Sequence, residues 1–346
     1  MCLNPLKGFQ VGVLPSGKMD LKVVSFLVDH LERFDSHWHE VYVPQVLYDA
    51  SNVVRDYVLV PCQKCLDCKM SYSRDWANRM MLENTYHSSS YFITLTYDDF
   101  NVPVSYYPDL DTGEARLAYT LRKDELSDFI KRLRRRLDYY GKKSDVRFYG
   151  VGEYGSNTFR PHYHVIVFGL ELDDLKELKR SPLGYKYYTS QTIESCWKLG
   201  YSMVCEVSWE TCAYVARYVT KKAYNSYSDE LMEFFGLERE MSRMSRMPGI
   251  GRLYFDEHKE EIYAHDRIYL STPKGGKEIK PPKYYDKLFD LEYQEEFAKL
   301  KAQRKEVAEA IQKVKLSQTD LSQEALYKVE LEALAERVKK LPRLDL

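Results

Sequence analysis

The stretch Val146–Phe168, VRFYGVGEYGSNTFRPHYHVIVF, decides the fold of the middle of this chain. Residues 146–154 and 163–169 are short runs of apolar, aromatic and β-branched side chains, which is typical of strands. Between these runs lie Gly155, Ser156 and Asn157, which favour a turn. The stretch therefore predicts an antiparallel β-hairpin.

Three polar side chains of this hairpin form a candidate metal site. Successive side chains of a strand point to opposite faces, so His162 and His164 share one face. Pairing across the hairpin brings Glu153 close to His162. Two imidazoles and one carboxylate suit a divalent metal ion and leave coordination positions open. The alternatives are a hydrogen-bonded or solvent-facing histidine pair and an ordinary hairpin glutamate.

A second His-x-His run, His37-Trp38-His39, is not followed by an apolar strand. We interpret it as a surface turn.

The phrase AYVARYVTKK at residues 213–222 predicts part of a helix that spans residues 209–223, with Ser208 as its N-cap. Tyr214 and Tyr218 are four residues apart, so they lie one turn apart on the same side of the helix. The same side carries three cations, Arg217, Lys221 and Lys222. Phenols beside a metal suit nucleophilic attack on phosphorus with a covalent tyrosyl intermediate. The alternative is a half-buried amphipathic helix with a solvated end.

Together, the histidine strand and the tyrosine helix predict an enzyme that nicks and joins DNA. The two phrases support each other, because neither is specific alone in a chain that contains 30 tyrosines.

Three of the seven cysteines, Cys62, Cys65 and Cys68, follow a Cys-x-x-Cys-x-x-Cys spacing that indicates a metal site. Cys2 is a candidate fourth thiolate, and four thiolates suit structural zinc. Three reduced thiols in a tight turn are the alternative.

The clearest basic element is a predicted helix at residues 123–140. Five cations surround its apolar stripe: Lys131, Arg132, Arg134, Arg135 and Arg136. Contact with DNA phosphates and a merely solvated helix face are both compatible with this pattern.

Length and composition allow two or three domains and a sizeable core, with 346 residues of which 44% are apolar. The net charge of −1 gives no global sign of a nucleic-acid partner. No apolar run approaches the roughly 18 residues of a membrane span, and the N-terminus lacks a signal-peptide pattern. We therefore expect no membrane association.

The predicted elements indicate an α+β fold, with a central antiparallel β-sheet flanked by helices. Strands are expected near 91–97, 146–154, 163–169 and 202–207, and helices near 71–86, 123–140, 174–180, 190–199 and 209–223. We divide the chain into an N-terminal region with the cysteine cluster (1–88), a catalytic core (89–225), a segment that wraps the core or contacts DNA (226–290), and a C-terminal helical extension (291–346).

Several phrases along residues 1–290 belong to one pattern: PCQKCLDC at 61–68, SRDWANR at 73–79, YFITLTYDD at 91–99, RPHYH at 160–164, YVARYVTKK at 214–222, PGIG at 248–251 and KPPKYY at 280–285. The chain resembles the replication initiators of the gokushovirus branch of the microviruses, which are small circular single-stranded-DNA bacteriophages. These initiators belong to the HUH endonucleases. Tyr163 departs from the class, which usually has a bulky hydrophobic residue between the histidines. The histidines precede the tyrosines, as in initiators and unlike plasmid relaxases.

The resemblance implies an RNA-recognition-like core and rolling-circle replication that begins with a site-specific nick at the viral origin. Tyr214 or Tyr218 would form a 5′-phosphotyrosine and release a 3′-hydroxyl for extension by host polymerase, alongside host helicase. Lys221 would assist the leaving group or lower the phenol's pKa. The phosphotyrosyl bond conserves energy, so no nucleotide cofactor is expected. The expected location is the host bacterial cytoplasm.

The implied metal at Glu153, His162 and His164 is Mg²⁺ or Mn²⁺, since magnesium prefers oxygen ligands and histidines favour softer ions. Two other functions remain open: an HUH transposase or relaxase, and a non-catalytic zinc-dependent DNA-binding protein.

Overall fold

The computed structural model describes residues 2–340 except 16, 18, 49–50, 156–157, 181–183, 185, 222–228 and 273–274; for 217–221 and 271–272 it describes the backbone alone. The chain forms two compact units. The described residues up to Ser71 and from Arg304 to Lys340 belong to the smaller unit, and Tyr72–Gln303 belongs to the larger unit.

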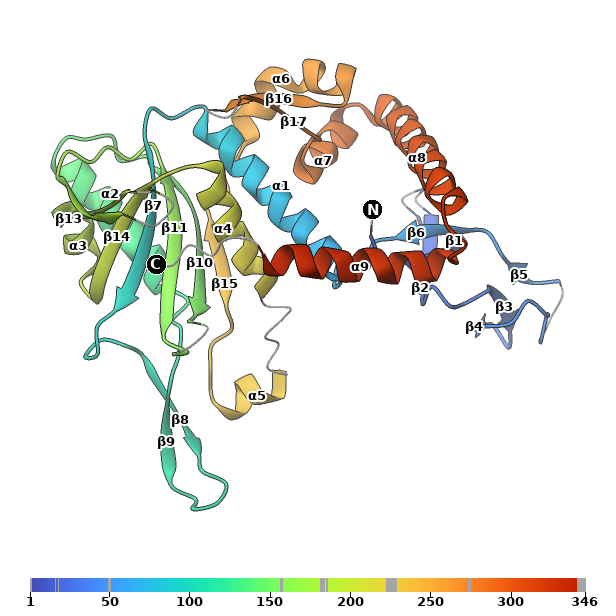
Figure 1. The fold of residues 1–346 in the computed structure, drawn as a ribbon, viewed down its shortest axis with the longest axis horizontal. Coiled ribbons are helices and arrows are strands. Elements are labelled where there is room, and N and C mark those ends of the chain that lie inside the picture. The colour runs from blue at the N-terminus through green and yellow to red at the C-terminus, as the bar shows by residue number, and fades with distance from the viewer. Residues whose placement is uncertain are drawn as a thin grey trace. The chain divides into compact units, whose positions relative to one another are not determined.

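A seven-stranded antiparallel sheet forms the centre of the larger unit (Figure 1). In spatial order its strands are β12 (Leu175–Arg180), β13 (Lys186–Ser190), β14 (Gly200–Glu206), β7 (Ser90–Tyr97), β11 (Pro161–Phe168), β10 (Arg147–Tyr154) and β15 (Met241–Met244). The predicted antiparallel sheet and its central β10–β11 hairpin are confirmed.

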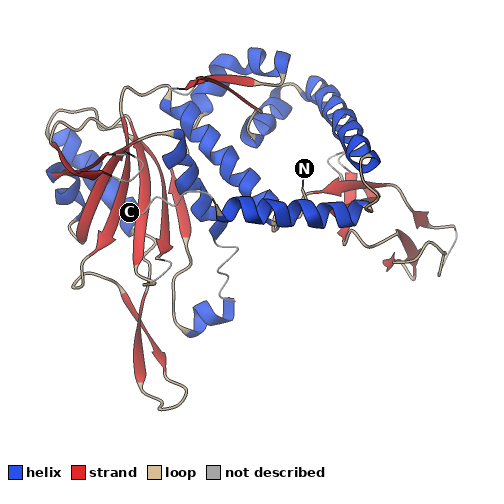
Figure 2. Ribbon diagram, in the orientation of Figure 1, coloured by secondary structure: helices blue, strands red, loops and turns tan. Residues whose placement is uncertain are grey.

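Helices cover both faces of this sheet (Figure 2). They are α2 (Glu125–Tyr139) and α3 (Gln191–Trp197) on one face, and α1 (Leu66–Asn84) and α4 (Trp209–Lys221) on the other. The alternation of β11 divides its side chains between the two cores. Tyr163 and Val165 pack with α2 and α3, whereas Ile166 and Phe168 pack with α1 and α4. His164 therefore lies on the α1/α4 face.

Glycines in β10 allow the α2 layer to pack closely. A Cβ atom on Gly150 would lie 2.7 Å from Leu126 Cδ2, and one on Gly152 would lie 2.9 Å from the Tyr163 ring. The glycines thus leave room for the helix on one face of the strand that carries Glu153 on the other.

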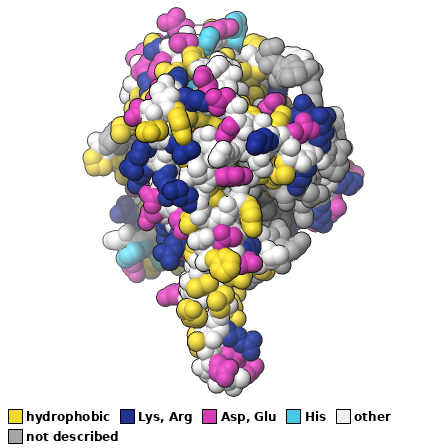
Figure 3. Space-filling view, turned by 90° about the vertical axis from the view of Figure 1, so that its left-hand side faces the viewer, with side chains coloured by type: hydrophobic (Ala, Val, Ile, Leu, Met, Phe, Trp, Pro, Cys, Tyr) yellow, Lys and Arg dark blue, Asp and Glu magenta, His cyan; other side chains and the backbone are white. Residues whose placement is uncertain are grey.

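A protruding hairpin and several peripheral elements complete the larger unit. Their bounds are β8 (Val104–Pro108), β9 (Ala115–Tyr119), α5 (Asp229–Phe234), α6 (Arg252–His265), β16 (Ile268–Thr272), β17 (Gly275–Ile279), α7 (Lys283–Glu292) and the start of α8 (Gln294–Ser317). Figure 3 shows hydrophobic side chains on the β8–β9 hairpin, where Tyr106, Leu110 and Leu117 are exposed.

Helix α1 holds two of the phrases that lie far downstream in sequence. The Arg79 guanidinium lies between the rings of Trp76 and Tyr284, 4.0 Å from each centroid, and donates to the Ile250 carbonyl. The buried Glu83 carboxylate accepts a hydrogen bond from the Gly251 amide. PGIG and KPPKYY therefore belong to the packing of α1.

The smaller unit contains two three-stranded sheets and helix α9 (Gln323–Lys339). The sheets are β2 (Met19–Val24), β1 (Leu6–Val13) and β6 (Tyr57–Val60), and β4 (His37–Val41), β3 (His30–Phe34) and β5 (Val53–Val54). Ser322 caps α9 by accepting from the Ala325 amide.

Two predicted elements are wrong. Residues 174–180, predicted as a helix, form strand β12, because pairing with β13 outweighs the helical propensity of LKELKR. His37–His39, predicted as a turn, lie in strand β4. The turn is two residues upstream at Asp35 and Ser36, whose positive φ angles of 46° and 65° suit a tight hairpin.

The four-part division of the chain at residues 88, 225 and 290 stays a prediction. Within the described residues, no helix combines the length and apolar character that a membrane span requires.

Candidate active site

The β10–β11 hairpin brings together the three predicted metal ligands. Glu153 pairs directly with His162, and His164 lies two residues further along the same face. Glu153 Oε1 is 2.8 Å from His162 Nε2 and 3.2 Å from His164 Nε2. Ligands in neighbouring octahedral positions, each about 2.1 Å from one ion, lie about 3 Å apart. The three side chains therefore fit one divalent ion.

Hydrogen bonds on the far side of each imidazole orient its Nε2 toward the carboxylate. His162 Nδ1 lies 3.1 Å from the Arg160 carbonyl, and because a carbonyl only accepts, Nδ1 carries the proton. His164 Nδ1 lies 3.0 Å from Thr94 Oγ1. Such contacts fix the ring orientation of metal-binding histidines.

The carboxylate is ionised although it is buried. Burial raises the pKa of Glu153, but hydrogen bonds from both histidines and their charges outweigh it and lower the pKa to about 2. Glu153 is 1% exposed and His164 is equally buried, whereas His162 is half-buried. The site is therefore anionic at its base and open to solvent at the His162 side.

Tyr214, one of the two predicted nucleophiles, packs beside the histidines. Its ring lies edge-on to His164, with centroids 5.5 Å apart, and Phe92 stacks against His164 at 5.4 Å. Tyr214 is 8% exposed, so this part of the predicted polar side of α4 faces the sheet.

Helix α4 begins where the sequence predicted. Ser208 Oγ accepts from the Thr211 amide, and Thr211 Oγ1 accepts from the Ser208 amide, which forms a reciprocal N-cap. Cys212, Val215 and Ala216 bury the apolar side. Arg217, Tyr218 and Lys221 lie in this helix with their side chains outside the described part of the structure, and Lys222 lies outside it altogether.

Two further residues belong to a row that crosses the sheet through the site. Tyr201 of β14 pairs with Thr96 of β7, Thr96 pairs with His162, and His162 pairs with Glu153. Directly paired residues share a face, so all four side chains lie on the face of the metal ligands. The ring of Tyr201 is 70% exposed.

The sequence reading did not identify Thr94, Thr96 or Tyr201. The alternation of YFITLTY predicted a strand and so a shared face for Thr94 and Thr96, but the register against His162 arises from pairing over long sequence separations.

Tyr163 packs inward as expected from its position between the histidines. It is fully buried, donates to the Arg122 carbonyl at 2.6 Å and accepts from the Arg122 amide. Arg160, at the start of the same strand, donates to the Tyr97 carbonyl and pairs with Asp99. These contacts hold the strand from the face opposite the site and from its end.

The basic helix α2 covers the sheet face opposite the histidines. Two of its five predicted DNA-binding cations donate to backbone carbonyls, Arg132 to Cys196 and Arg134 to Val146. Arg136 lies over the ring of Tyr140, whereas Lys131 and Arg135 are exposed. On this side, cations and carboxylates are interspersed (Figure 3). DNA binding by this helix stays a prediction.

The four cysteines predicted as zinc ligands also come together, in the smaller unit. Cys2 Sγ lies 3.6 Å from Cys62 Sγ and 3.7 Å from Cys65 Sγ, and all four sulfurs are within 4.8 Å of one another. His37 and His39 belong to neither candidate metal group of the described residues.

Fold and site define an α+β protein whose antiparallel sheet presents two histidines and a glutamate beneath a tyrosine-bearing helix. The sequence model for the replication-associated protein ORF2 family matches residues 90–223.

Three curated phage proteins are similar to the chain. Replication-associated protein ORF2 of Spiroplasma virus 4 is 35% identical over 241 residues, or 69% of this chain and 70% of that protein. Replication-associated protein VP4 of Bdellovibrio phage phiMH2K is 28% identical and covers 76% of this chain and 80% of its own length. Replication-associated protein ORF4 of Chlamydia phage 1 is 32% identical, with 77% and 65% covered. No solved structure shows significant similarity.

The chain therefore belongs to the family of phage replication-associated proteins, as a replication initiator of the microvirus type. The resemblance seen in the sequence motifs is confirmed.

Proposed function

We propose that this protein starts rolling-circle replication by nicking single-stranded DNA at the phage origin, and later rejoins the strand, through a 5′-phosphotyrosine. The observation that carries the proposal is the contact between Tyr214 and His164, which sets a candidate nucleophile beside three converging metal ligands. Membership of the replication-associated family supports replication over transposition or plasmid transfer.

The chemistry begins with the phosphate at the open side of the site, next to His162. A bound Mg²⁺ or Mn²⁺ supplies positive charge to the scissile phosphate and the departing oxygen. Glu153, His162 and His164 hold that ion, while Thr94 and the Arg160 carbonyl keep both imidazoles turned toward it.

The phenol of Tyr214 or Tyr218 attacks phosphorus, and the bond from phosphorus to the 3′ oxygen breaks. The electron pair of that bond stays on the 3′ oxygen. The phenol loses a proton and the 3′ oxygen gains one, which leaves a 3′-hydroxyl for host polymerase. Attack of a 3′-hydroxyl on the phosphotyrosine reverses these steps, so rejoining consumes no nucleotide. Two phenols one turn apart allow one to hold the 5′ end while the other cuts again.

The exposed ring of Tyr201 extends the site along the row that contains His162. Aromatic side chains next to a phosphate-binding site serve as stacking platforms for single-stranded bases. Tyr201 therefore places a base two strands away from the metal ligands, with the backbone of the DNA running past His162.

Covalent trapping tests the proposal. The full-length protein is incubated with labelled single-stranded oligonucleotides that tile the phage origin, in Mn²⁺ or Mg²⁺, and adducts are separated on a denaturing gel. We expect a metal-dependent adduct that is lost in His162→Ala and in the double variant Tyr214→Phe/Tyr218→Phe. Tyr139→Phe, which changes an exposed phenol on α2, is the matched control and keeps wild-type adduct levels.

The outcomes separate the functions. Absence of an adduct with every origin oligonucleotide overturns the nicking function and leaves a non-catalytic DNA-binding protein. An adduct that persists in the double variant shows that a different residue is the nucleophile.

A further inference from the structure

We propose that Cys2, Cys62, Cys65 and Cys68 bind one zinc ion that stabilises the smaller unit. This site is separate from the nicking chemistry, and its test does not depend on that chemistry.

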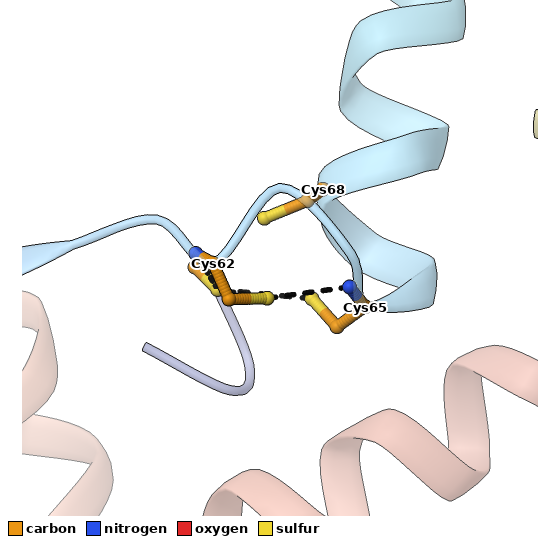
Figure 4. Close-up of side chains that lie close together, drawn as sticks. Cys62, Cys65 and Cys68 are labelled. Carbon is orange, nitrogen blue, oxygen red and sulfur yellow. Dashed lines mark hydrogen bonds between the residues drawn. The ribbon is translucent and has the colours of Figure 1, made fainter. Parts of the chain in front are cut away.

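The sulfur positions match a tetrahedral tetrathiolate site. Four sulfurs at the usual zinc–sulfur distance of about 2.3 Å form a tetrahedron with edges of about 3.8 Å. The separations of Cys2 Sγ from Cys62 Sγ and Cys65 Sγ are 3.6 Å and 3.7 Å. The Cys68 sulfur completes the group within 4.8 Å. Figure 4 shows Cys62, Cys65 and Cys68 gathered at the start of α1.

The same distances disfavour other uses of four cysteines. A disulfide requires a sulfur–sulfur distance of about 2.05 Å, and all four residues are free cysteines. An iron–sulfur cluster places several iron and sulfide ions among its thiolates and so needs a wider arrangement.

The local backbone supports thiolates at these positions. The Cys62 amide donates to Cys2 Sγ at 3.4 Å, and the Cys65 amide donates to Cys62 Sγ at 3.2 Å. Gln63 has a positive φ of 59°, which bends the chain between Cys62 and Cys65. Cys65 directly precedes α1 and Cys68 lies in its first turn, where the helix dipole favours negative charge.

The site connects parts of the smaller unit that are far apart in sequence. Cys2 precedes β1, and Cys62 follows β6, the strand that pairs with β1. An ion shared by these cysteines and α1 fixes the ends of the sheet to the start of the helix.

The small apolar core of the smaller unit is consistent with stabilisation by a metal ion. Its hydrophobic cluster contains four buried residues, Phe9, Val24, Val28 and Leu31. Many of its large apolar side chains are exposed, among them Val13, Met19 and Leu27. Domains with little buried apolar surface are commonly stabilised by disulfides or metal ions.

Metal analysis of the purified full-length protein tests the proposal. We expect one zinc per chain by elemental mass spectrometry in the wild type and in the double variant His162→Ala/His164→Ala. Cys65→Ser loses this zinc. Cys196→Ala, a change of a buried cysteine in the larger unit, is the matched control and retains it.

A second measurement on the wild type covers the case in which Cys65→Ser does not fold. A thiol-specific mercurial added to the folded protein releases one zinc, detected by a chromogenic chelator. Cobalt exchanged into the site shows thiolate charge-transfer bands and the visible bands of a tetrahedral ion.

Three results overturn the proposal. They are a wild type that contains no zinc and gives no cobalt bands, zinc content that is unchanged in Cys65→Ser, and iron in place of zinc. A nicking-defective protein that still contains the zinc leaves the proposal intact, so failure of one function is distinguishable from failure of the other.

Discussion

At the scale of single residues, Thr94 is expected to act as a positioning residue through His164. Its hydroxyl contacts Nδ1 of that histidine at 3.0 Å, and it is buried. We predict that Thr94→Ala raises the Mn²⁺ concentration for half-maximal adduct formation about 10–100-fold, because partners of this kind tune metal affinity to that extent. Excess Mn²⁺ restores activity, and Thr94→Ser retains the wild-type midpoint. An unchanged midpoint in Thr94→Ala contradicts this role.

A second residue-scale prediction concerns Glu83, whose carboxylate contacts Arg147, His87 and the Gly251 amide. Burial raises the pKa of Glu83, but these partners outweigh burial and lower it. A lowered folded-state pKa means that the stabilisation is fully present above the ordinary value of about 4.3 and is lost as the pH falls through the folded-state pKa.

Glu83→Gln should therefore lower the free energy of unfolding most at pH 7, by about 3–5 kcal/mol, because Arg147 is left in a largely buried position. The difference from the wild type shrinks in acid. Urea unfolding followed by tryptophan fluorescence at pH 7 and at about pH 3.5 measures both values. The exposed Glu295→Gln is the control. A difference independent of pH rules out an ionic role for Glu83.

At the scale of elements, the row through β14, β7, β11 and β10 predicts a stacking role for Tyr201. Loss of one base–aromatic stack costs about 1–3 kcal/mol, so Tyr201→Ala should weaken single-stranded DNA binding by roughly 5- to 150-fold. Tyr201→Phe keeps the ring and should bind normally. Fluorescence anisotropy with a labelled oligonucleotide, in the presence of chelator, measures affinity without cleavage. Tyr139→Ala on the opposite face is the control, and equal affinities for both alanine variants exclude this DNA path.

Elements whose pairing is local could be predicted from the sequence. Glu153 and His162 lie nine residues apart on one hairpin, so alternation alone determined their face and proximity. Tyr201 and Thr96 are 105 residues apart, and nothing in either strand specifies their register. The strand LKELKR failed for the related reason that an exposed edge strand carries a polar, helix-like pattern. The sequence thus predicted the metal ligands and missed the residues that other strands contribute.

At the scale of the whole molecule, the two compact units lead to different expectations for unfolding. The larger unit buries two apolar clusters on either side of its sheet and a third around Phe255 and Tyr285. The smaller unit has one cluster of four buried residues. Metal binding to a folded state stabilises it by mass action, so zinc removal should act on the unit that holds the cysteines.

We predict that a thiol-specific mercurial converts the unfolding of the full-length protein into two separated thermal transitions. The first transition moves to lower temperature and the second stays in place, because Cys196, Cys205 and Cys212 of the larger unit are buried. Scanning calorimetry measures both transitions, and brief proteolysis of the treated protein should cut first between residues 3 and 61. Added zinc and excess thiol should restore the original trace. Equal downward shifts of both transitions would mean that the reagent had reached the core cysteines, and Cys205→Ala and Cys212→Ala variants would then identify which one. Loss of proteolytic protection throughout residues 72–303 would show instead that the larger unit depends on the cysteine site for its own stability.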